Sequence, residues 1–304
     1  MKIMLTGING QVGGELTRSL AGLGEVVAFD RQTLDLGDAA RLRSVIRQLR
    51  PQLIVNPAAY TAVDRAQSEP DLARAINADA PAIMAEEAQK LGAALIHYST
   101  DYVFDGSKEG AYSETDVTNP QSVYGQTKLA GEQAVAALCD AHWIWRTSWV
   151  YGVHGGNFLK TMLRLAAERP SLRVVADQFG APTFARAIAD ATRDALRARG
   201  ADNLADAVRG SAGIYHFSAG GRTSWHGYAQ HVIMRAEQAG QVLQVKAADI
   251  EAIPASAYPV PAPRPANSSL SVDKFVRTFG LPVAQWQDDV DRCLVELLGQ
   301  HDPA

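Results

Sequence analysis

The pair Tyr124 and Lys128 has the residue types and the spacing of an acid–base site. The two residues are four positions apart and would share one face of a helix. A nearby ammonium group stabilises a phenolate, so Lys128 is expected to lower the pKa of Tyr124 towards neutrality. Such a tyrosine can donate a proton to a carbonyl oxygen while a hydride reaches the carbon. The pair alone is weak evidence, because an exposed amphipathic helix often carries both residues.

A second candidate group is the hydroxyl of Thr100, in the segment Tyr98-Ser99-Thr100-Asp101. This segment ends an apolar run at 93–98 that is typical of a buried strand. Ligands of parallel sheets lie at the carboxyl ends of strands, where the Thr100 hydroxyl could polarise the carbonyl that Tyr124 protonates. The two groups therefore support one another.

A glycine-rich turn from Thr6 to Gly13 follows the first apolar run and has the spacing GxxGxxG. Gly7 permits a tight turn, Gly10 lets the backbone approach a pyrophosphate, and Gly13 lets the helix pack on the strand. The start of the following helix offers free N–H groups to phosphates. A purely structural turn is the less favoured alternative.

The choice between NADH and NADPH stays open on the sequence. Asp30 ends the second apolar run, where a carboxylate can accept hydrogen bonds from the adenosine ribose and favour NAD. Its neighbour Arg31 could instead attract a 2′-phosphate. Asp30 could also be no more than a solvated strand end.

The elements that must position these groups alternate along the first half of the chain. Short apolar runs predict strands at 2–5, 26–29, 53–56, 93–98 and 143–146. Amphipathic stretches predict helices at 11–21, 39–49, 72–91, 126–138, 157–167 and 185–199. This alternation predicts an α/β fold, a Rossmann-like doubly wound parallel sheet with a smaller C-terminal substrate-binding lobe. We expect an NAD(P)-binding domain at 1–150 and a mainly substrate-binding lobe at 151–304, from which some segments could return to the sheet.

Two segments of the second half interrupt the pattern. Residues 200–213 are polar and contain glycines, which predicts a break between elements. Residues 253–265 contain five prolines and are expected to form an ordered loop between the lobes.

Composition and charge exclude several classes of protein. The chain has 304 residues, of which 47% are hydrophobic and 20% charged, and 29 basic against 33 acidic residues give a net charge of −4. This is a globular composition without a basic run, so neither nucleic acid nor a membrane is an expected partner. Cys139 and Cys293 are expected to be reduced thiols, and no signal peptide or membrane span is predicted, which favours a cytoplasmic protein. No histidine spacing favours a metal hydrolase.

Five segments carry a resemblance to a known family: Ser99–Gly106, Tyr124–Glu132, Arg146–Gly152, Asp177–Thr183 and Arg264–Ser268. They resemble the extended short-chain dehydrogenase/reductase superfamily and, within it, the dTDP-4-dehydrorhamnose reductases. The resemblance runs from the first strand to about Trp286. It implies NADPH- or NADH-dependent reduction of the 4-keto group of dTDP-4-dehydro-L-rhamnose, the last step towards dTDP-L-rhamnose.

The resemblance also implies roles for individual residues. Thr100 matches the hydroxyl that polarises the ketone, Tyr124 the proton donor, and Lys128 the residue that tunes this tyrosine and holds the nicotinamide ribose. The expected cofactor contacts also include Gly7, Asn9, Gly10, Gln11, Val12, Asp30, Asp35, Leu36, Ala59, Tyr60, Thr61 and Tyr98. Thr100, Asp101 and Trp149 are expected to contact the substrate. The Trp149 ring has a flat face that could pack on a sugar or base, and Arg264 could pair with the diphosphate.

The resemblance is weakest at a magnesium site that some members hold between subunits with several glutamates. Glu15 matches one of these ligands, but Arg186 and Gln287 stand at the other two positions. Asp190 and Asp288 lie close in sequence to these two positions and could provide replacement ligands. Because hard cations need clusters of oxygen ligands, a magnesium ion is disfavoured but left open with Glu15 as the one candidate ligand, and a homodimer is left open as well.

Other functions compete with this interpretation. A related dehydratase would have Asp-Glu after the threonine, whereas Thr100 is followed by Asp101 and Tyr102. A non-catalytic NADP-binding regulatory subunit could have the same fold, but the acid–base groups are all present. A reductase of another nucleotide-linked 4-keto-deoxy sugar is the third alternative.

Overall fold

A six-stranded parallel sheet forms the centre of the computed structural model, which describes residues 1–200 and 204–299. The strand order is β10-β5-β4-β3-β1-β2, with every neighbouring pair parallel. The strands are β1 (Lys2–Leu5), β2 (Glu25–Ala28), β3 (Leu53–Asn56), β4 (Ala94–Thr100), β5 (His142–Thr147) and β10 (Gly213–His216). The predicted doubly wound α/β fold is confirmed.

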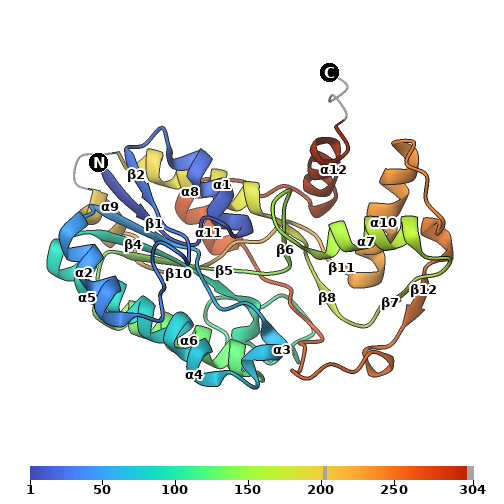
Figure 1. Cartoon of the computed structure of the whole chain (residues 1–304), viewed down its shortest axis with the longest axis horizontal. Coiled ribbons are helices and arrows are strands. Elements are labelled where there is room, and N and C mark those ends of the chain that lie inside the picture. Colours follow the sequence, from blue (N-terminus) through green and yellow to red (C-terminus); the bar gives the residue numbers. More distant parts are fainter. Residues whose placement is uncertain (201–203, 300–304) are drawn as a thin grey trace.

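Helices cover both faces of this sheet (Figure 1). One face packs against α1 (Gln11–Leu20), α8 (Ala185–Arg199), α9 (Leu204–Arg209) and α11 (Asp273–Phe279). The other packs against α2 (Ala39–Leu49), α5 (Ala80–Leu91) and α6 (Val123–Leu138). Alternate residues of one strand point to opposite faces, so Leu95 packs on the second layer while its neighbour Ile96 packs on the first. The strands are therefore apolar throughout, as expected for a parallel sheet buried on both faces.

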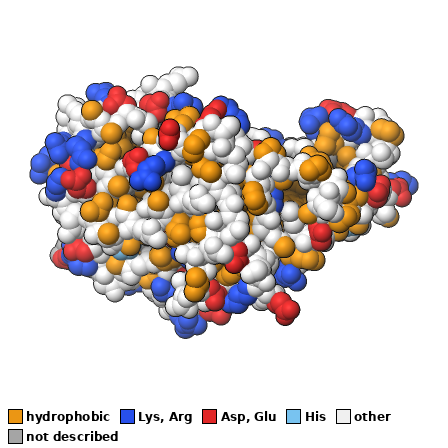
Figure 2. Space-filling model, turned by 90° about the horizontal axis from the view of Figure 1, so that it is seen from below, with side chains coloured by type: hydrophobic (Ala, Val, Ile, Leu, Met, Phe, Trp, Pro, Cys, Tyr) orange, Lys and Arg blue, Asp and Glu red, His pale blue; other side chains and the backbone are white. Residues whose placement is uncertain are grey.

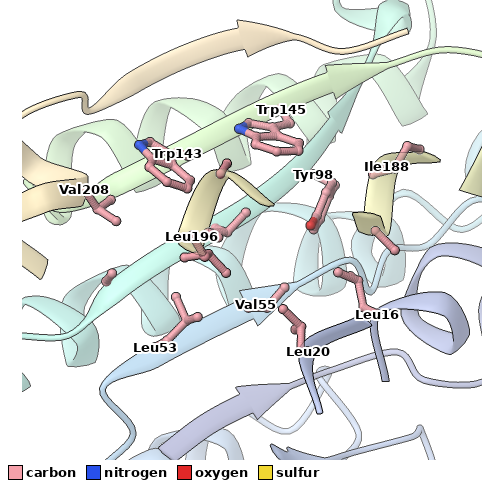
Figure 3. Close-up of a cluster of buried hydrophobic side chains, with 14 of the residues drawn as sticks. Leu16, Leu20, Leu53, Val55, Tyr98, Trp143, Trp145, Ile188, Leu196 and Val208 are labelled. Atoms are coloured by element: carbon pink, nitrogen blue, oxygen red, sulfur yellow. The ribbon is translucent and has the colours of Figure 1, made fainter. Parts of the chain in front are cut away.

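Aromatic rings fill the first of these two interfaces (Figure 3). Trp143 and Trp145 of β5 lie in this core together with Tyr98 of β4. The Trp145 ring meets Phe275 of α11 edge to face, with 5.0 Å between ring centroids. Large rigid rings of this kind fix the position of β4 and β5, the two strands that end at the predicted site.

The C-terminal elements gather beyond the sheet (Figure 1), and Figure 2 shows basic and acidic side chains interspersed on one face of both parts. Their core lies between α7 (Phe158–Glu168), α10 (Trp225–Gln238) and α12 (Trp286–Leu297). Three two-stranded ribbons join them: β6 (Val150–Tyr151) with β9 (Thr183–Phe184), β7 (Arg173–Val175) with β12 (Glu251–Ile253), and β8 (Phe179–Gly180) with β11 (Thr223–Ser224). The division into lobes at 150/151 stays a prediction, and residues 201–203 and 300–304 of the second lobe lie outside the described residues.

Short helices connect these elements. They are α3 (Val63–Ala66), α4 (Pro70–Arg74), the π-helix η1 (Ala75–Asp79) and the 3-10 helices η2 (Asp101–Val103), η3 (Ala247–Asp249) and η4 (Ala255–Ala257). No helix in the described part of the chain is long and apolar enough to cross a membrane.

The structure differs from the predicted elements in three places. The single helix expected at 72–91 is interrupted by the π-turn η1, which lies between α4 and α5. The break expected at 200–213 contains α9, whose Leu204 and Val208 are buried in the core. Strand β10 was not predicted, and it pairs with β5 at the edge of the main sheet. Its sequence, Gly-Ile-Tyr-His, does not form the continuous apolar run that marked the predicted strands.

The π-turn brings α6 unusually close to the preceding helices at Gly131. A Cβ atom at this glycine would lie 2.1 Å from the backbone oxygen of Asn77 in η1. A backbone atom in a packed core cannot retreat at low cost. Close approach therefore explains a glycine in the interior of α6.

Gly131→Ala should lower the free energy of unfolding by at least about 2 kcal/mol, because the new methyl group overlaps Asn77. Helix propensity alone would change stability in the opposite direction, by about 1 kcal/mol. Urea denaturation of the variant and the wild type measures the difference. The control is Gly110→Ala, where a Cβ meets no atom within 4 Å and little change is expected. Equal stability of all three proteins would contradict the close approach.

Candidate active site

Thr100 and Tyr124 meet at the carboxyl end of β4. Thr100 is the last residue of that strand and is buried. Tyr124 lies in the first turn of α6, which begins at the N-cap Ser122, whose hydroxyl accepts a hydrogen bond from the Gly125 N–H. Burial raises the pKa of the Tyr124 phenol, and the Thr100 hydroxyl lies near enough to oppose this rise slightly. The predicted acid and the predicted polarising hydroxyl are thus brought together.

Gly125 explains how the start of α6 comes so near to β4. A Cβ atom at Gly125 would lie 2.2 Å from the backbone oxygen of Tyr102 in η2, the turn that follows β4. The rings of Tyr102 and Tyr124 meet edge to face, with 5.4 Å between their centroids. Only glycine permits this approach of helix and turn.

Asp101 lies beside the two hydroxyls and is almost fully buried. Its Oδ1 atom accepts a hydrogen bond from the Thr100 hydroxyl at 3.0 Å, and the nearby Ser268 partly opposes the rise that burial causes in the carboxyl pKa. Burial raises the pKa of Asp101 to about 6. Oδ2 is buried without a partner among the described residues. A buried acceptor with no partner is costly, so a ligand that donates a hydrogen bond would be favoured there.

Lys128 lies one helical turn after Tyr124 and is 1% exposed. Its Nζ donates a hydrogen bond to the backbone oxygen of Tyr98 at 2.6 Å and lies 3.3 Å from Nε2 of His97. Burial lowers the pKa of Lys128 to about 8, and the charge of Glu132 opposes this effect. The Lys128 side chain is therefore fixed against β4.

A series of buried polar side chains extends from His97 across the sheet. Asn56 Nδ2 lies 3.1 Å from Nδ1 of His97, and the Thr6 hydroxyl donates to Oδ1 of Asn56 at 2.6 Å. All of these side chains are buried. Burial and the nearby charge of Lys128 hold the pKa of His97 well below its usual value, so the imidazole is neutral. These polar side chains connect Lys128 to Thr6, the first residue of the glycine turn.

A buried ion pair between Arg146 and Glu132 fixes α6 to β5. Arg146 donates two hydrogen bonds to the Glu132 carboxylate, from Nε at 2.9 Å and from Nη2 at 2.7 Å. Both side chains are nearly inaccessible. Bidentate geometry compensates for the desolvation of the two charges and fixes the helix at one position on the strand.

The structure corrects the expected effect of Lys128 on Tyr124. Burial raises the pKa of Tyr124 to about 12, and the nearby Thr100 hydroxyl only partly opposes it. The Lys128 ammonium is directed to Tyr98 and His97, and it forms no hydrogen bond to Tyr124 within the described residues. The described surroundings therefore keep Tyr124 protonated, as a proton donor must be.

The glycine turn has the predicted geometry for a dinucleotide. Gly7 has φ +64°, and a Cβ atom at Gly13 would lie 2.1 Å from the Gly7 oxygen, so both positions require glycine. Helix α1 begins at the N-cap Gly10 without a capping side chain among the described residues. Its first N–H groups are consequently available to phosphate oxygens. The turn therefore fits the diphosphate of a nicotinamide dinucleotide.

Gln11 and Val12 have side chains with structural contacts. Gln11 Nε2 donates to the Val150 oxygen at 3.2 Å, and its Oε1 accepts from Asn157 at 3.0 Å. Val12 packs on the sheet core. Gln11 thus connects the phosphate turn to the C-terminal elements.

The predicted adenosine contacts cluster after β2. Asp30 accepts hydrogen bonds from the N–H groups of Gln32 and Thr33 and from Asn9, which together hold its pKa below the usual value. Arg31 has a 74% exposed side chain and an ion pair of 3.9 Å with Asp35. Leu36, in contrast, is buried in the core under α2, so only its backbone remains for a ligand.

The loop after β3 holds the predicted residues Ala59, Tyr60 and Thr61, and Asn77 fastens it. The Tyr60 N–H donates to Oδ1 of Asn77 at 2.8 Å, and Asn77 Nδ2 donates to the Tyr60 oxygen at 3.1 Å. Asn77 belongs to η1. The π-turn therefore sets the conformation of this loop, while the Tyr60 hydroxyl donates to Glu69.

Tyr98 takes a different position from the one predicted. Its ring lies in the aromatic core against α8, where its hydroxyl hydrogen-bonds to Thr192 at 2.7 Å. Only its backbone oxygen faces Lys128. The phenol therefore supports the strand, and the contribution of Tyr98 to the site is through its backbone.

Trp149 follows β5 by two residues, and the structure corrects its predicted role as a stacking platform. The Trp225 ring lies against it with 3.7 Å between centroids and 14° between planes. Gly180 covers the opposite face, where a Cβ atom would lie 2.7–3.1 Å from ring atoms. Trp149 also has φ +47°, a conformation that costs a non-glycine residue about 1–3 kcal/mol. No face of the ring is free for a sugar.

Arg264 lies near Tyr102, but an acidic side chain already binds it. Its Nη2 donates to Asp64 at 2.8 Å, while Nη1 is buried without a partner among the described residues. A cavity of about 110 Å³ opens beside it, lined by Tyr102, Phe104, Asp105, Gln121, Ser122, Pro263, Arg264 and Pro265. The free Nη1 leaves Arg264 able to donate to an anionic ligand.

Glu15 has cationic partners. Arg186 donates to its carboxylate from Nε at 3.0 Å and from Nη2 at 3.2 Å, and Arg18 donates at 3.2 Å. Arg186 also pairs with Glu296. Within residues 1–200 and 204–299 no group of three metal-ligating side chains forms a candidate metal site. The residues present do not fit a magnesium ion, because a guanidinium occupies the position where a further carboxylate would be needed.

Sequence reasoning missed several residues that shape the site. His97, Asn77, Ser268 and Trp225 were not among the candidates, although each contacts one. A histidine in an otherwise apolar strand was the available signal for His97, because a buried polar side chain needs a partner. The others lie far in sequence from the residues they contact and carry no local signal.

Comparison with known proteins places the whole chain in one family. A family model described as "RmlD substrate binding domain" matches residues 1–298. A dTDP-4-dehydrorhamnose reductase of Salmonella typhimurium is 49% identical over 301 residues, which cover 98% of each chain.

Solved structures agree. A dTDP-4-dehydrorhamnose reductase from Clostridium acetobutylicum superposes with a TM-score of 0.88 at 35% identity, covering 99% of this chain and 100% of that one. Another from Bacillus anthracis, in complex with NADP, gives 0.85 at 33% identity, covering 97% and 99%. The predicted family is therefore confirmed.

The difference in unfolding free energy between Lys128→Met and the wild type should depend on pH. The pKa of Lys128 is lowered from 10.5 to about 8 by folding, so between these values the unfolded state binds more protons. Wild-type stability therefore rises from pH 8 to 10.5 on account of this group. Relative to the wild type, the variant should lose about 2 kcal/mol between pH 7 and pH 10, measured by urea denaturation. A difference that does not change with pH would contradict a buried ammonium.

Proposed function

The chain belongs to the dTDP-4-dehydrorhamnose reductase family, and we propose that it reduces the 4-keto group of dTDP-4-dehydro-L-rhamnose with NADPH or NADH. The product is dTDP-L-rhamnose, so this is the last step in the biosynthesis of that nucleotide sugar. The observation that carries the proposal is the placement of two neighbouring hydroxyls at the carboxyl end of β4, Thr100 on the strand and Tyr124 in the first turn of α6.

The residues of the glycine turn support a nicotinamide dinucleotide as the cofactor. The diphosphate would lie on the first turn of α1, and Asp30 with Arg31 would face the adenosine ribose. When bound, the reduced nicotinamide supplies the hydride. Both NADPH and NADH are carried forward, because Asp30 suits a ribose hydroxyl and Arg31 suits a 2′-phosphate.

Residues of the chain itself then supply the proton to the C4 oxygen. Tyr124 is neutral at physiological pH because burial raises its pKa to about 12, so its hydroxyl can donate to the C4 oxygen as negative charge develops there. Thr100 orients the same oxygen by a hydrogen bond when its hydroxyl turns from Asp101 Oδ1, to which it donates in this structure. Lys128 donates to the Tyr98 oxygen and lies 3.3 Å from His97, so we assign it the placement of the nicotinamide ribose rather than a shift in the pKa of Tyr124.

The substrate would be held by residues from both lobes. Asp101 offers its unpartnered Oδ2 to a sugar hydroxyl, and Nη1 of Arg264 is available to the diphosphate. Trp149 would contribute its ring edge. No step requires a metal ion, since the surroundings of Glu15 are filled by arginines.

A homodimer and a reducing cytoplasmic location stay predictions. The two cysteines, Cys139 and Cys293, are free thiols buried far apart in different clusters. Free buried thiols suit a reducing compartment.

Tyr124→Phe should lower kcat about 10²–10⁴-fold, because the variant has no proton donor at the carbonyl. NADPH affinity should stay within about threefold, since the lost hydroxyl is proposed to act on the substrate. The assay follows NADPH consumption with enzymatically generated dTDP-4-dehydro-L-rhamnose, and fluorescence titration measures NADPH binding. The control is the exposed Tyr258→Phe, which should retain full activity. Equal losses of turnover and cofactor affinity would overturn the role of Tyr124.

Arg31→Ala should raise the KM for NADPH about tenfold and leave the KM for NADH nearly unchanged, because only NADPH has a 2′-phosphate for the guanidinium. Steady-state kinetics with each cofactor provides the measurement. Arg41→Ala, another exposed arginine close by, is the matched control and should affect neither value. If Arg31→Ala changes both KM values alike, Arg31 does not select the cofactor.

A further inference from the structure

Trp149 has a backbone conformation that its place in the chain does not explain. Among described non-glycine residues, only Arg50 and Trp149 have positive φ values. Arg50 ends helix α2 as a left-handed C-cap, which is an ordinary place for that conformation. Trp149 lies between β5 and β6, with no helix end nearby. An unfavourable conformation that persists must be held by its surroundings, and such residues cluster at functional sites.

One ribbon supplies the groups that cover both faces of the Trp149 indole. In the β8–β11 ribbon Gly180 pairs with Thr223, and Trp225 follows the ribbon directly as the first residue of α10. The Cβ position of Gly180 lies nearest to Cε2, Cζ2 and Cδ2 of Trp149, which are contiguous atoms of the six-membered ring. Such distances place Gly180 over the ring face, opposite to the stacked Trp225.

The ribbon is itself held firmly. The Arg222 guanidinium lies 4.1 Å from the centroid of the Phe179 ring, within cation–π distance and across the two strands. Phe158 of α7 packs on Trp225 with 4.7 Å between ring centroids. Trp225 is therefore fixed by the C-terminal lobe before it meets Trp149.

Trp149 is placed close to the reacting groups by strand register. Thr147 pairs with Thr100 across β5 and β4, and Trp149 follows Thr147 by two residues. With both faces covered, the ring can meet a ligand only through its edge. Among the described residues no hydrogen bond engages the indole Nε1–H of Trp149, and the residue is only partly buried.

We propose that Trp225 is a positioning residue that, together with Gly180, holds Trp149 edge-on to the substrate. The indole N–H then donates a hydrogen bond to an oxygen of the nucleotide-linked sugar, and the ring does not stack on it. This inference rests on the proposed function, since it assumes a sugar at that place. It assigns substrate selection partly to a ribbon of the C-terminal lobe that itself carries no reacting group.

The experiment compares Trp225→Leu and Trp225→Phe with the wild type. Leucine removes the stacked ring, whereas phenylalanine keeps an aromatic cover. We expect Trp225→Leu to raise the KM for dTDP-4-dehydro-L-rhamnose and the Kd for dTDP-L-rhamnose about tenfold or more, with NADPH affinity unchanged. Trp225→Phe should restore most of the sugar affinity. Trp286→Phe, a second tryptophan of the same lobe core, is the matched control and should change neither constant.

Circular dichroism reports the geometry independently of turnover. Two stacked indoles couple their transitions. Trp143 and Trp145 form a second stacked pair, with 6.3 Å between ring centroids, so the Trp149–Trp225 couplet is read as a difference from the wild-type spectrum. It should be present in Trp286→Phe and lost in Trp225→Leu and Trp225→Phe. If Trp225→Leu loses the couplet, remains folded and keeps its sugar affinity, the positioning role is wrong. Equal weakening of sugar and NADPH binding would also overturn it, because that result indicates a general structural effect.

A double-mutant cycle tests the edge-on hydrogen bond. Trp149→Phe retains an aromatic ring but lacks the N–H, so it should weaken dTDP-L-rhamnose binding several-fold in the wild type. In the Trp225→Leu background the same change should add little, because the ring is already misplaced. Full additivity would overturn the coupling. A wild type that binds dTDP-L-rhamnose but does not turn over the keto sugar would reject the proposed reaction and leave this inference standing.

Discussion

The burial of one ammonium group, that of Lys128, determines how the rest of the site is built. A charge this deep in a protein needs a hydrogen-bond acceptor that cannot move away, and here it is a backbone oxygen of β4, with the imidazole of His97 3.3 Å away. His97 of β4 contacts Asn56 of β3, and Asn56 accepts from Thr6, which directly follows β1. This series of polar side chains reaches from the acid–base helix to the glycine turn. One buried polar network therefore connects the residues proposed for the substrate with those proposed for the cofactor.

Helix α6 can present Tyr124 and Lys128 correctly only if it lies very close to its neighbours. Gly125 lets its first turn approach η2, and Gly131 lets its middle approach the π-turn η1. The bidentate pair of Glu132 with Arg146 then prevents sliding along β5. The two glycines and the buried ion pair therefore define the position of α6 more tightly than the apolar face of the helix could.

The sequence was sufficient for the fold, and it singled out the candidate acid–base residues, whose roles stay predictions, because both depend on local patterns. Apolar runs, the glycine turn and the Tyr124–Lys128 spacing each lie within a few residues. Contacts between distant segments could not be predicted in this way. The cover of Trp149 comes from Gly180 and Trp225, and the direction of the Lys128 amine depends on His97 in another element. Tyr98 was misplaced for a related reason, since strand alternation directs its ring into the core while its backbone serves the site.

Strand β10 has a consequence for how the chain can be divided. It comes from the second half of the sequence, yet it forms the edge of the main sheet beside β5, and α8, α9 and α11 cover Trp143 and Trp145. A gene fragment that stops at residue 150 would therefore leave an open strand edge and a bare aromatic surface, both of which promote aggregation. Residues 1–150 are therefore not a transplantable module. Engineers who exchange substrate specificity between relatives should graft loops and ribbons rather than whole lobes.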